Sequence, residues 1–410
     1  MSILKNSKIL LGVSGSIAAF KSAHIVREFI KRGAEVQVVI TDAAKDFVTP
    51  LTLSTVSNRP VYNNFIEDDQ KAYGVWNNHV EMGLWADLLI VAPASSNTLS
   101  KMVTGACDNL LSAVYMSAKC PVFVAPAMDL DMFKNGATTK NLEILSNRGV
   151  EIIDAEFGEL ASGLVGKGRM AEPEHIFVAV EKYCLKLSPL YGKQVLINAG
   201  PTHEHLDPVR YLGNNSSGRM GAALAKSAYT LGANVTLILG PTQADLDIAH
   251  IDTINVVSAA EMLEATVSKF SDAHLTICTA AVSDFRPLNV DTNKIKKVGK
   301  ASKLTLELEE TPDILASLGP LKREGQYLIG FALETQNGPS YAKAKLVSKS
   351  ADAIVLNVLG KQGVGFNSST NEVHVYFADG NEIFYPIQSK EILGGVLMSL
   401  FTKHFPLRNE

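Results

Sequence analysis

Residues 194–239 read QVLINAGPTHEHLDPVRYLGNNSSGRMGAALAKSAYTLGANVTLIL, and this stretch decides the fold. Two short apolar runs flank a polar loop and a segment whose apolar residues recur at the helical period. This succession predicts a βαβ unit with two parallel strands. The same pattern occurs earlier in the chain, beginning at Lys8-Ile-Leu-Leu-Gly-Val13. The sequence therefore predicts an α/β fold with two doubly wound, Rossmann-like parallel-sheet domains.

The first loop of the second unit is longer than its counterpart. In both units a glycine, Gly33 or Gly232, ends the first helix as its C-cap. From the end of the first strand to that glycine there are 20 residues in the first unit and 34 in the second, so the second loop has 14 additional residues. Doubly wound folds bind ligands at the carboxyl ends of their strands, and a long loop there is usually functional. This loop carries the polar residues Asp207, Arg210, Asn214, Asn215, Ser216 and Ser217.

The length and composition favour a two-domain enzyme. A chain of 410 residues is long for one hydrophobic core. Ser188-Pro189 breaks a predicted helix, so we place the domains at residues 1–186 and 187–410. A hydrophobic content of 46% with 20% charged residues is typical of a soluble globular protein. The net charge of −4 predicts no nucleic-acid partner.

The sequence carries no signal for secretion or membrane insertion. The polar segment Met1–Lys8 leads straight into a strand, so we expect no signal peptide. No apolar stretch approaches the roughly 20 residues that a membrane span needs. The four cysteines lie far apart without a CxxC pair, which favours reduced thiols over zinc or disulfides. We therefore expect a cytoplasmic protein without a membrane partner.

Two loops at strand ends in the first half suit a cofactor. The turn Ser14-Gly15-Ser16 leads into a helix, where backbone amides and the Ser16 hydroxyl can meet a phosphate. A plain tight turn explains this segment equally well, because the GxGxxG fingerprint is absent. The second strand ends in Thr41-Asp42, and an Asp there can hold a ribose. NAD is therefore an alternative cofactor.

Further polar segments follow in the same half. Ala92-Pro-Ala-Ser-Ser-Asn-Thr98 offers hydrogen-bond donors for a phosphate or a flavin edge, although Ser96 or Asn97 can instead cap a helix. Ala125-Pro-Ala-Met-Asp-Leu-Asp-Met132 follows the next strand. The Gly-rich segment 158–170 fits either a lid over a pocket or a surface hairpin. His79 is a candidate base, but a lone His is more often structural.

Together and in order, these motifs resemble a known family. Residues 8–180 resemble the flavin-containing cysteine decarboxylases, and residues 190–400 resemble the ligase that joins cysteine to phosphopantothenate. The order matches the fused phosphopantothenoylcysteine decarboxylase/phosphopantothenate–cysteine ligases of coenzyme A biosynthesis. In the second half the resemblance rests on Ala199-Gly-Pro-Thr202, Asp207-Pro-Val-Arg210, Ser216-Ser-Gly218, Ala280-Ala-Val-Ser-Asp284, Lys294-Ile-Lys-Lys297 and Pro312-Asp-Ile314.

The resemblance implies that the first domain is flavodoxin-like, binds FMN and decarboxylates phosphopantothenoylcysteine. The flavin takes electrons from the cysteine thiol, and the thioaldehyde so formed is the electron sink that lets CO2 leave. His79 would be the catalytic base, and Ser162 would be the catalytic residue of the lid. The implied FMN contacts are Gly15, Ser16, Thr41, Ser95, Asn97, Thr98 and Met128. The implied substrate contacts are Asp129, Arg169 and Met170.

Two residues depart from the family's pattern. Asp129 stands where the family has Asn, and an ionised carboxylate there would repel the carboxylate of the substrate. Ser162 stands where the family has a Cys that protonates the enethiolate. Because a hydroxyl is a far weaker acid than a thiol, a proton donor other than Ser162 is an alternative in this chain.

The second domain, by resemblance, binds CTP and Mg2+ and ligates 4'-phosphopantothenate with cysteine through an acyl-cytidylate. Such an anhydride needs cations around its phosphates. Asn214 and Arg210 would act on the acyl-cytidylate, and Asp284 would bind the metal or the nucleotide. The basic cluster Lys294–Lys297 can equally be a solvated surface, and residues 294–303 are a candidate flap. The implied CTP contacts are Cys278, Thr279, Ala280, Asp284, Lys294, Pro312, Asp313, Ile314, Leu315, Phe331, Lys345 and Lys349.

Two alternatives belong to other functional classes. An NAD(P)-dependent two-domain dehydrogenase would share these folds, and the missing GxGxxG argues against it. A flavin-binding protein without chemistry is kept open by the two departures at Asp129 and Ser162. The family also suggests a homo-oligomer, with trimers of the flavin domain and dimers of the ligase domain.

Overall fold

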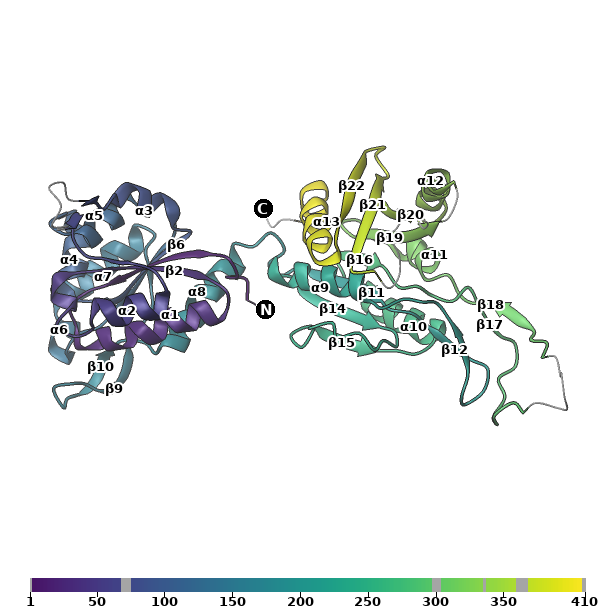
Figure 1. The fold of residues 1–410 in the computed structure, drawn as a ribbon, viewed down its shortest axis with the longest axis horizontal. Helices are drawn as coiled ribbons and strands as arrows, with labels where there is room; N and C mark the ends of the chain where they lie inside the picture. The colour runs from purple at the N-terminus through teal and green to yellow at the C-terminus, as the bar shows by residue number, and fades with distance from the viewer. Residues whose placement is uncertain (1, 68–74, 297–303, 335–336, 359–367, 408–410) are drawn as a thin grey trace. The chain divides into compact units, whose positions relative to one another are not determined.

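The computed structural model describes residues 2–67, 75–296, 304–334, 337–358 and 368–407. The chain forms two compact units, Met1–Cys184 and Leu185–Glu410, each built around its own sheet (Figure 1). Within the described ranges, no helix has both the length and the apolar character that a bilayer crossing requires. The candidate flap is described only as far as Lys296, so residues 297–303, including Lys297, lie outside the described residues.

The first unit contains a six-stranded sheet in the order β3-β2-β1-β6-β7-β8. All neighbouring strands in it are parallel. The order reverses between β1 and β6, so the switch point at which doubly wound folds bind ligands lies between these strands. The strands are β1 (Lys8–Val13), β2 (Glu35–Ile40), β3 (Val61–Tyr62), β6 (Leu88–Ala94), β7 (Val122–Pro126) and β8 (Glu151–Ile152).

Helices cover both faces of this sheet because the strands bury apolar residues on both sides. One face packs against α1 (Ser22–Lys31), α2 (Pro50–Ser57) and α8 (Pro173–Lys186). The other packs against α3 (His79–Trp85), α4 (Ser96–Thr104), α5 (Leu110–Ser117) and α7 (Gly136–Asn147). The shorter elements are η1 (Ile17–Lys21), η2 (Asp42–Ala44), β4 (Ile66–Glu67), β5 (Val75–Trp76), α6 (Leu130–Lys134), β9 (Glu156–Glu159) and β10 (Val165–Arg169).

The second unit contains an eight-stranded sheet in the order β15-β14-β11-β16-β19-β20-β21-β22. It is parallel from β15 to β20, and β21 and β22 extend it as an antiparallel ribbon. The strands are β11 (Gln194–Ala199), β14 (Asn234–Leu239), β15 (Asp252–Asn255), β16 (Leu275–Cys278), β19 (Tyr327–Glu334), β20 (Ala353–Val358), β21 (Thr370–Phe377) and β22 (Glu382–Ser389).

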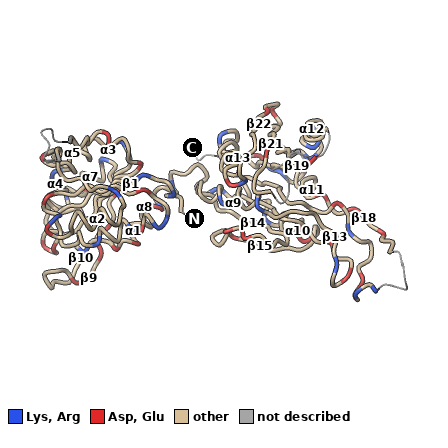
Figure 2. Tube along the Cα trace, viewed as in Figure 1, with Lys and Arg blue, Asp and Glu red and all other residues tan. Residues whose placement is uncertain are grey.

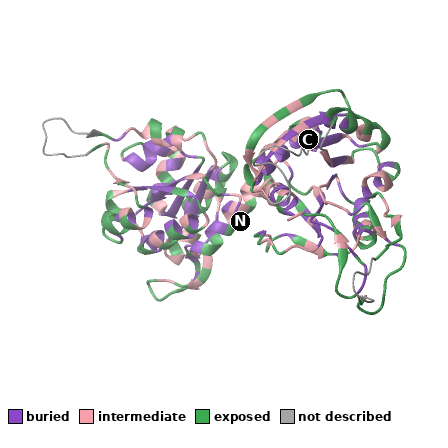
Figure 3. Cartoon of the chain, turned by 45° about the vertical axis from the view of Figure 1, so that its right-hand side comes forward, coloured by how far each residue is buried: buried purple, intermediate pink, exposed green. Residues whose placement is uncertain are grey.

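This sheet is also covered on both faces, and Figure 3 shows its central strands as buried. α9 (Arg219–Thr230) and α13 (Lys390–His404) cover one face, while α10 (Ala259–Phe270), α11 (Ile314–Leu318) and α12 (Gly338–Ser348) cover the other. The 3-10 turn η3 (Gly319–Leu321) follows α11. The predicted class of two doubly wound, Rossmann-like domains is therefore confirmed.

The long loop of the second unit is a folded hairpin. It contains β12 (His203–His205) paired antiparallel with β13 (Tyr211–Gly213), and a second small ribbon joins β17 (Phe285–Pro287) to β18 (Leu308–Glu310). Arg32 and Leu231 are the C-caps of α1 and α9, so the prediction that glycine would be the cap was wrong by one residue. Gly33 and Gly232 follow the caps with φ of 87° and 90°, the left-handed conformation that glycine adopts after a helix. Figure 2 shows basic and acidic residues interspersed along both units.

Candidate functional sites

In the first unit, the loops after β1 and β6 are joined at the switch point. Ser14 Oγ donates to Pro93 O at 2.8 Å and accepts from the amide of Ser95 at 2.8 Å. Gly15 admits no side chain, because a Cβ there would lie 2.6 Å from the Cβ of Ala43. Ser16 Oγ accepts from the amide of Ala18 at 3.3 Å and caps η1. The predicted turn and the 93–98 segment thus lie side by side.

Ser95 is the residue that caps α4, so the expectation that Ser96 or Asn97 would be the cap was wrong. The Oγ of Ser95 accepts from the amide of Thr98 at 3.3 Å and contacts Thr98 Oγ1 at 3.2 Å. Ser95 has an extended backbone, with φ −72° and ψ 159°, whereas the helix already includes Ser96. Asn97 is exposed in the first turn of this helix.

Thr41 and His79 each leave a buried polar atom without a partner. Among the described residues, Thr41 Oγ1 and His79 Nδ1 are two of three such side-chain atoms. An unsatisfied buried polar group costs about 1–3 kcal/mol, so a ligand that supplies partners is favoured there. The His79 ring lies edge-on to Phe65 and Trp76, with centroids at 6.0 and 6.3 Å. Both residues are ones that the resemblance assigns to the flavin site, and their free atoms fit a polar cofactor.

The two residues that depart from the family's pattern contact each other. Ser162 Oγ donates to Asp129 Oδ1 at 3.0 Å, and the same oxygen accepts from the amide of Leu130 at 2.6 Å, where Asp129 caps α6. The Gly-rich segment is a β9–β10 hairpin, and the amide of Met128 donates to Gly168 O at 3.1 Å. The hairpin therefore lies against the loop that carries Met128 and Asp129.

Arg169 and Met170 are not placed as free substrate contacts. Arg169 Nη2 pairs with Glu172 Oε1 at 2.7 Å. The same Glu172 oxygen accepts from Lys21 Nζ at 2.9 Å. The Met170 side chain is 1% exposed and belongs to the core beneath α1 and α8. The predicted substrate contacts of Arg169 and Met170 therefore stay predictions.

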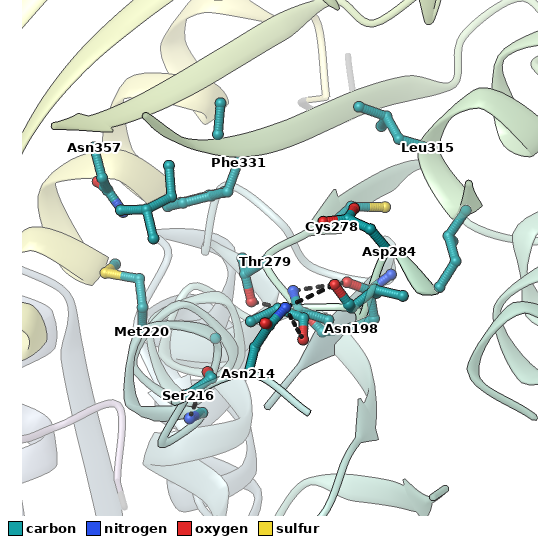
Figure 4. Close-up of a pocket in the computed structure, with 18 of the residues that line it drawn as sticks. Asn198, Asn214, Ser216, Met220, Cys278, Thr279, Asp284, Leu315, Phe331 and Asn357 are labelled. Carbon is teal, nitrogen blue, oxygen red and sulfur yellow. Dashed lines mark hydrogen bonds between the residues drawn. The ribbon is translucent and has the colours of Figure 1, made fainter. Parts of the chain in front are cut away.

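In the second unit, a cavity of about 690 Å³ lies at the carboxyl edge of the sheet (Figure 4). The structure brings most of the predicted nucleotide residues together around it. Those lining the cavity are Asn214, Cys278, Thr279, Ala280, Asp284, Pro312, Asp313, Ile314, Leu315, Phe331, Lys345 and Lys349. The amino terminus of α9 also lines it, and its N-cap Gly218 provides no side chain to satisfy the first amides.

Hydrogen bonds fix the polar wall of this cavity. Asn214 Nδ2 donates to the carbonyls of Ala281 and Val282 at 3.3 and 2.8 Å. Asn198, at the end of β11, accepts from the amide of Ala280 at 3.1 Å through Oδ1 and from Thr279 Oγ1 at 2.7 Å through its carbonyl. The Asn214 amide oxygen is thereby oriented by the main chain after β16. Figure 4 shows Asn198, Asn214 and Thr279 grouped together, with Phe331 and Asn357 across the cavity.

Lysine side chains supply positive charge at another wall. Lys349 Nζ pairs with Asp313 Oδ2 at 2.9 Å, and Lys345 Nζ pairs with Glu334 Oε1 at 2.9 Å. Burial raises the pKa of Asp313, but the amide of Ala316 and the Lys349 ammonium outweigh it and hold the pKa below its usual value. Both ammonium groups are therefore held at the cavity wall by carboxylates.

Cys278 is a neutral thiol in this cavity. Burial raises its pKa to about 12, so the thiolate needed for nucleophilic attack or metal ligation is not populated near neutral pH. No group of three or more acidic, His or Cys side chains suited to a metal occurs among the described residues. Asp284 is exposed at the cavity, where a single carboxylate suits Mg2+ that is held mainly by phosphates.

Two predicted residues do not line the cavity. Arg210 Nη1 pairs with Asp207 Oδ2 at 3.0 Å and donates to Ile295 O at 3.2 Å. Lys294 lies in the segment beside Ile295. Sequence reasoning missed several lining residues that lie far apart in the chain, namely Asn198, Arg219, Asn357, Asn371 and Lys390. Of these residues, only Asn198 could have been predicted from the sequence, because it is a polar residue near the end of an apolar strand.

Comparisons with known proteins define the class of the chain. Residues 2–184 match the family model described as Flavoprotein, and residues 190–404 match the model of the DNA/pantothenate metabolism flavoprotein C-terminal domain. A coenzyme A biosynthesis bifunctional protein CoaBC from Vibrio vulnificus strain CMCP6 is 42% identical over 393 residues, covering 96% of each chain. The CoaBC protein of Escherichia coli K12 is 38% identical over 407 residues, covering 99% of each.

A third relative bears a different name. A cysteine/cysteine sulfinic acid decarboxylase from an unknown prokaryotic organism is 46% identical over 360 residues, which are 87% of this chain and 99% of that protein. The matches thus define a flavoprotein domain fused to a pantothenate-metabolism domain. The chain belongs to the family of CoaBC bifunctional proteins of coenzyme A biosynthesis, and its activities are a decarboxylase and a ligase. The predicted family is confirmed, and the dehydrogenase and non-catalytic alternatives have no support.

Proposed function

We propose that the first unit, over residues 1–186, binds FMN and decarboxylates phosphopantothenoylcysteine to 4'-phosphopantetheine. The observation that carries this proposal is the pair of unsatisfied buried atoms, Thr41 Oγ1 and His79 Nδ1. FMN, when bound, supplies the two-electron oxidation of the cysteine thiol. Gly15, Ser16, Ser95, Asn97, Thr98 and Met128 would hold the cofactor at the switch point. His79 would take the proton from the substrate, since its Nδ1 has no competing protein partner.

Purification without added flavin tests the cofactor. The protein should be yellow, and heat should release FMN without FAD or a nicotinamide. A colourless preparation that also fails to take up added FMN would contradict the proposal.

Substitution of His79 tests the base. His79→Asn should abolish decarboxylation and leave ligation intact, because the two sites belong to different cores. His24→Asn, which changes an exposed histidine of α1, is the matched control and should retain both activities. Loss of both activities in a folded, flavin-loaded His79→Asn protein would contradict a separate decarboxylase site.

For the second unit, residues 187–410, we propose CTP-dependent ligation of 4'-phosphopantothenate with cysteine. The cavity lined by Lys345, Lys349 and the open amino terminus of α9 supports this, because these groups suit a polyphosphate. An acyl-cytidylate forms with release of pyrophosphate, and the cysteine amine then displaces CMP. Asp284 would bind Mg2+ together with the phosphates. Pyrophosphate release that requires CTP, phosphopantothenate and Mg2+ tests the proposal, and equal rates with every nucleotide would count against CTP.

We further propose a cytoplasmic homo-oligomer, with trimers of the flavin domain and dimers of the ligase domain. Apolar side chains beside His79 are exposed, including Trp76 at 57% and Leu84 at 61%, and such exposure is typical of a contact surface. The four cysteines are free thiols, as a reducing compartment requires. Mass measurement in solution by light scattering would contradict the proposal if the protein were a monomer.

A further inference from the structure

The carboxylate of Asp207 joins two segments that are distant in the sequence. It is 1% exposed and sits in the β12–β13 hairpin. Its Oδ1 accepts from the amides of Val209 and Arg210 at 2.7 and 2.8 Å. Its Oδ2 accepts from Arg210 Nη1 at 3.0 Å and from the amide of Ile295 at 3.1 Å. One oxygen therefore holds the local turn, and the other reaches across to residue 295.

Both the N–H and the C=O of Ile295 are hydrogen-bonded to the hairpin. Its amide donates to Asp207, and its carbonyl accepts from Arg210 Nη1 at 3.2 Å. A further backbone hydrogen bond, from the amide of Asp291 to Leu206 O at 3.0 Å, fastens the same segment to the hairpin. Lys294 and Lys296 flank Ile295 directly. Because the peptide unit is planar, fixing the N–H and the C=O of Ile295 restricts the main chain that carries Lys294 and Lys296.

We propose that Asp207 and Arg210 form a positioning clamp that holds Ile295 and thereby directs the neighbouring Lys294 toward the triphosphate of CTP. The inference rests on the proposed role of Lys294 in CTP use. It assigns Asp207 a function outside the cavity, and it gives Arg210 a positioning role in this protomer. Hydrogen bonds to a charged group are roughly twice as strong as neutral ones, so a buried carboxylate suits such a clamp.

The variant Asp207→Asn separates the two functions of the carboxylate. An amide oxygen can still accept from Val209 and Arg210, so the turn is kept. The amide nitrogen then faces two donors, Arg210 Nη1 and the amide of Ile295, and the clamp is lost. We expect kcat/KM for CTP to fall roughly tenfold, mainly through KM, since one charge-assisted contact is worth about that much or more. Decarboxylation should not change.

A double-mutant cycle in the full-length protein distinguishes positioning from a general structural effect. When Lys294→Gln is already present, Asp207→Asn should lower kcat/KM for CTP by less than about twofold, because the side chain to be positioned is gone. Asp352→Asn is the matched control. Asp352 also accepts a backbone amide, Leu328 N at 2.7 Å, and a lysine, Lys322 Nζ at 2.8 Å, but it precedes β20 at the opposite edge of the sheet. The effect of Asp352→Asn on kcat/KM for CTP should be the same in the wild type and in Lys294→Gln.

Amide exchange supplies a readout that does not depend on activity. In Asp207→Asn, exchange of the Ile295 amide should speed up, while exchange in β11 and β16 stays as in the wild type. The clamp would be overturned if Asp207→Asn lowered kcat/KM for CTP equally in the wild type and in Lys294→Gln. It would also be overturned if the exchange rate of the Ile295 amide did not change. If Lys294→Gln alone leaves CTP use intact, the proposed role of Lys294 fails, and with it the link from the clamp to CTP.

Discussion

The hydroxyl of Ser162 donates to Asp129, so two polar residues meet where the family's pattern has a thiol and an amide. Because the hydroxyl of Ser162 is the poorer acid, we expect Ser162→Cys to speed reoxidation of the reduced flavin by the enethiol intermediate. The double variant Ser162→Cys/Asp129→Asn should be faster still, because a neighbouring carboxylate disfavours the thiolate. Stopped-flow absorbance measures both rates.

Asp129→Asn alone is the control for this pair, because it removes the charge and keeps the hydroxyl. An unchanged rate in Ser162→Cys would show that another group donates the proton. A slower rate would instead show that the hydrogen bond between Ser162 and Asp129 has a positioning role.

Asn214 and Lys294 are expected to act at different moments of ligation. Lys294→Gln removes a charge and should slow formation of the acyl-cytidylate, at a cost of roughly 1.5–3 kcal/mol in transition-state stabilisation. Asn214 Nδ2 donates to the main chain at Ala281 and Val282, and Asn214→Asp places an oxygen against those carbonyls. We expect that variant to form the intermediate and pass it poorly to cysteine. Quenched reactions with CTP, phosphopantothenate and cysteine measure the accumulated acyl-cytidylate. If the intermediate accumulated only in Lys294→Gln, Lys294 would act in the transfer to cysteine and Asn214 in formation of the intermediate.

At the scale of elements, the sequence located the central strands but not the small ribbons. β1 and β11 are short apolar runs followed by helices that end just before a glycine, so local pattern was sufficient. β12 and β13 are three-residue strands, too short to show a period. The loop between them also contacts a distant segment, because Arg210 donates to Ile295, which lies 85 positions away. The role of Arg210 on the acyl-cytidylate was expected from the family resemblance and stays a prediction, and Arg210 itself does not line the cavity.

The β9–β10 hairpin is fastened to α8 by a pair that responds to pH. Glu156 Oε1 lies 2.6 Å from His175 Nδ1, and the hydrogen bond and charge of Glu156 raise the pKa of His175 above 6.5. Burial raises the pKa of Glu156, but hydrogen bonds from His175 and the Glu172 amide outweigh it and leave that pKa below 4.5.

The two shifts define where the pair stabilises the hairpin. The raised pKa of His175 gives a stabilisation that is complete below pH 6.5 and lost as the pH rises through the folded value. The lowered pKa of Glu156 gives a stabilisation that is complete above pH 4.5 and lost as the pH falls through the folded value. An NMR titration should show His175 above its ordinary pKa, and Glu156→Gln should return it. An unshifted His175 in the wild type would contradict this pairing.

For the whole molecule, each unit has a core of its own, since the apolar clusters of the first unit contain residues only up to Cys184 and those of the second begin at Leu190. A domain with its own core can fold and unfold as one cooperative unit. The ligands proposed for the two units differ, because FMN would bind the first and CTP the second. Each ligand should therefore stabilise only the unit that binds it.

Matched core substitutions test this independence. Phe29 in α1 is 1% exposed, and Phe401 in α13 is fully buried. Truncation of a buried Phe to Ala costs about 3–5 kcal/mol through lost burial and the cavity left behind. In calorimetry, Phe29→Ala should lower only the transition that FMN raises, and Phe401→Ala only the one that CTP with Mg2+ raises. If either variant shifted both transitions equally, the units would be energetically coupled. In that case, a loss of ligation in His79→Asn could result from destabilisation of the second unit, and it would not by itself show that the flavin site takes part in ligation.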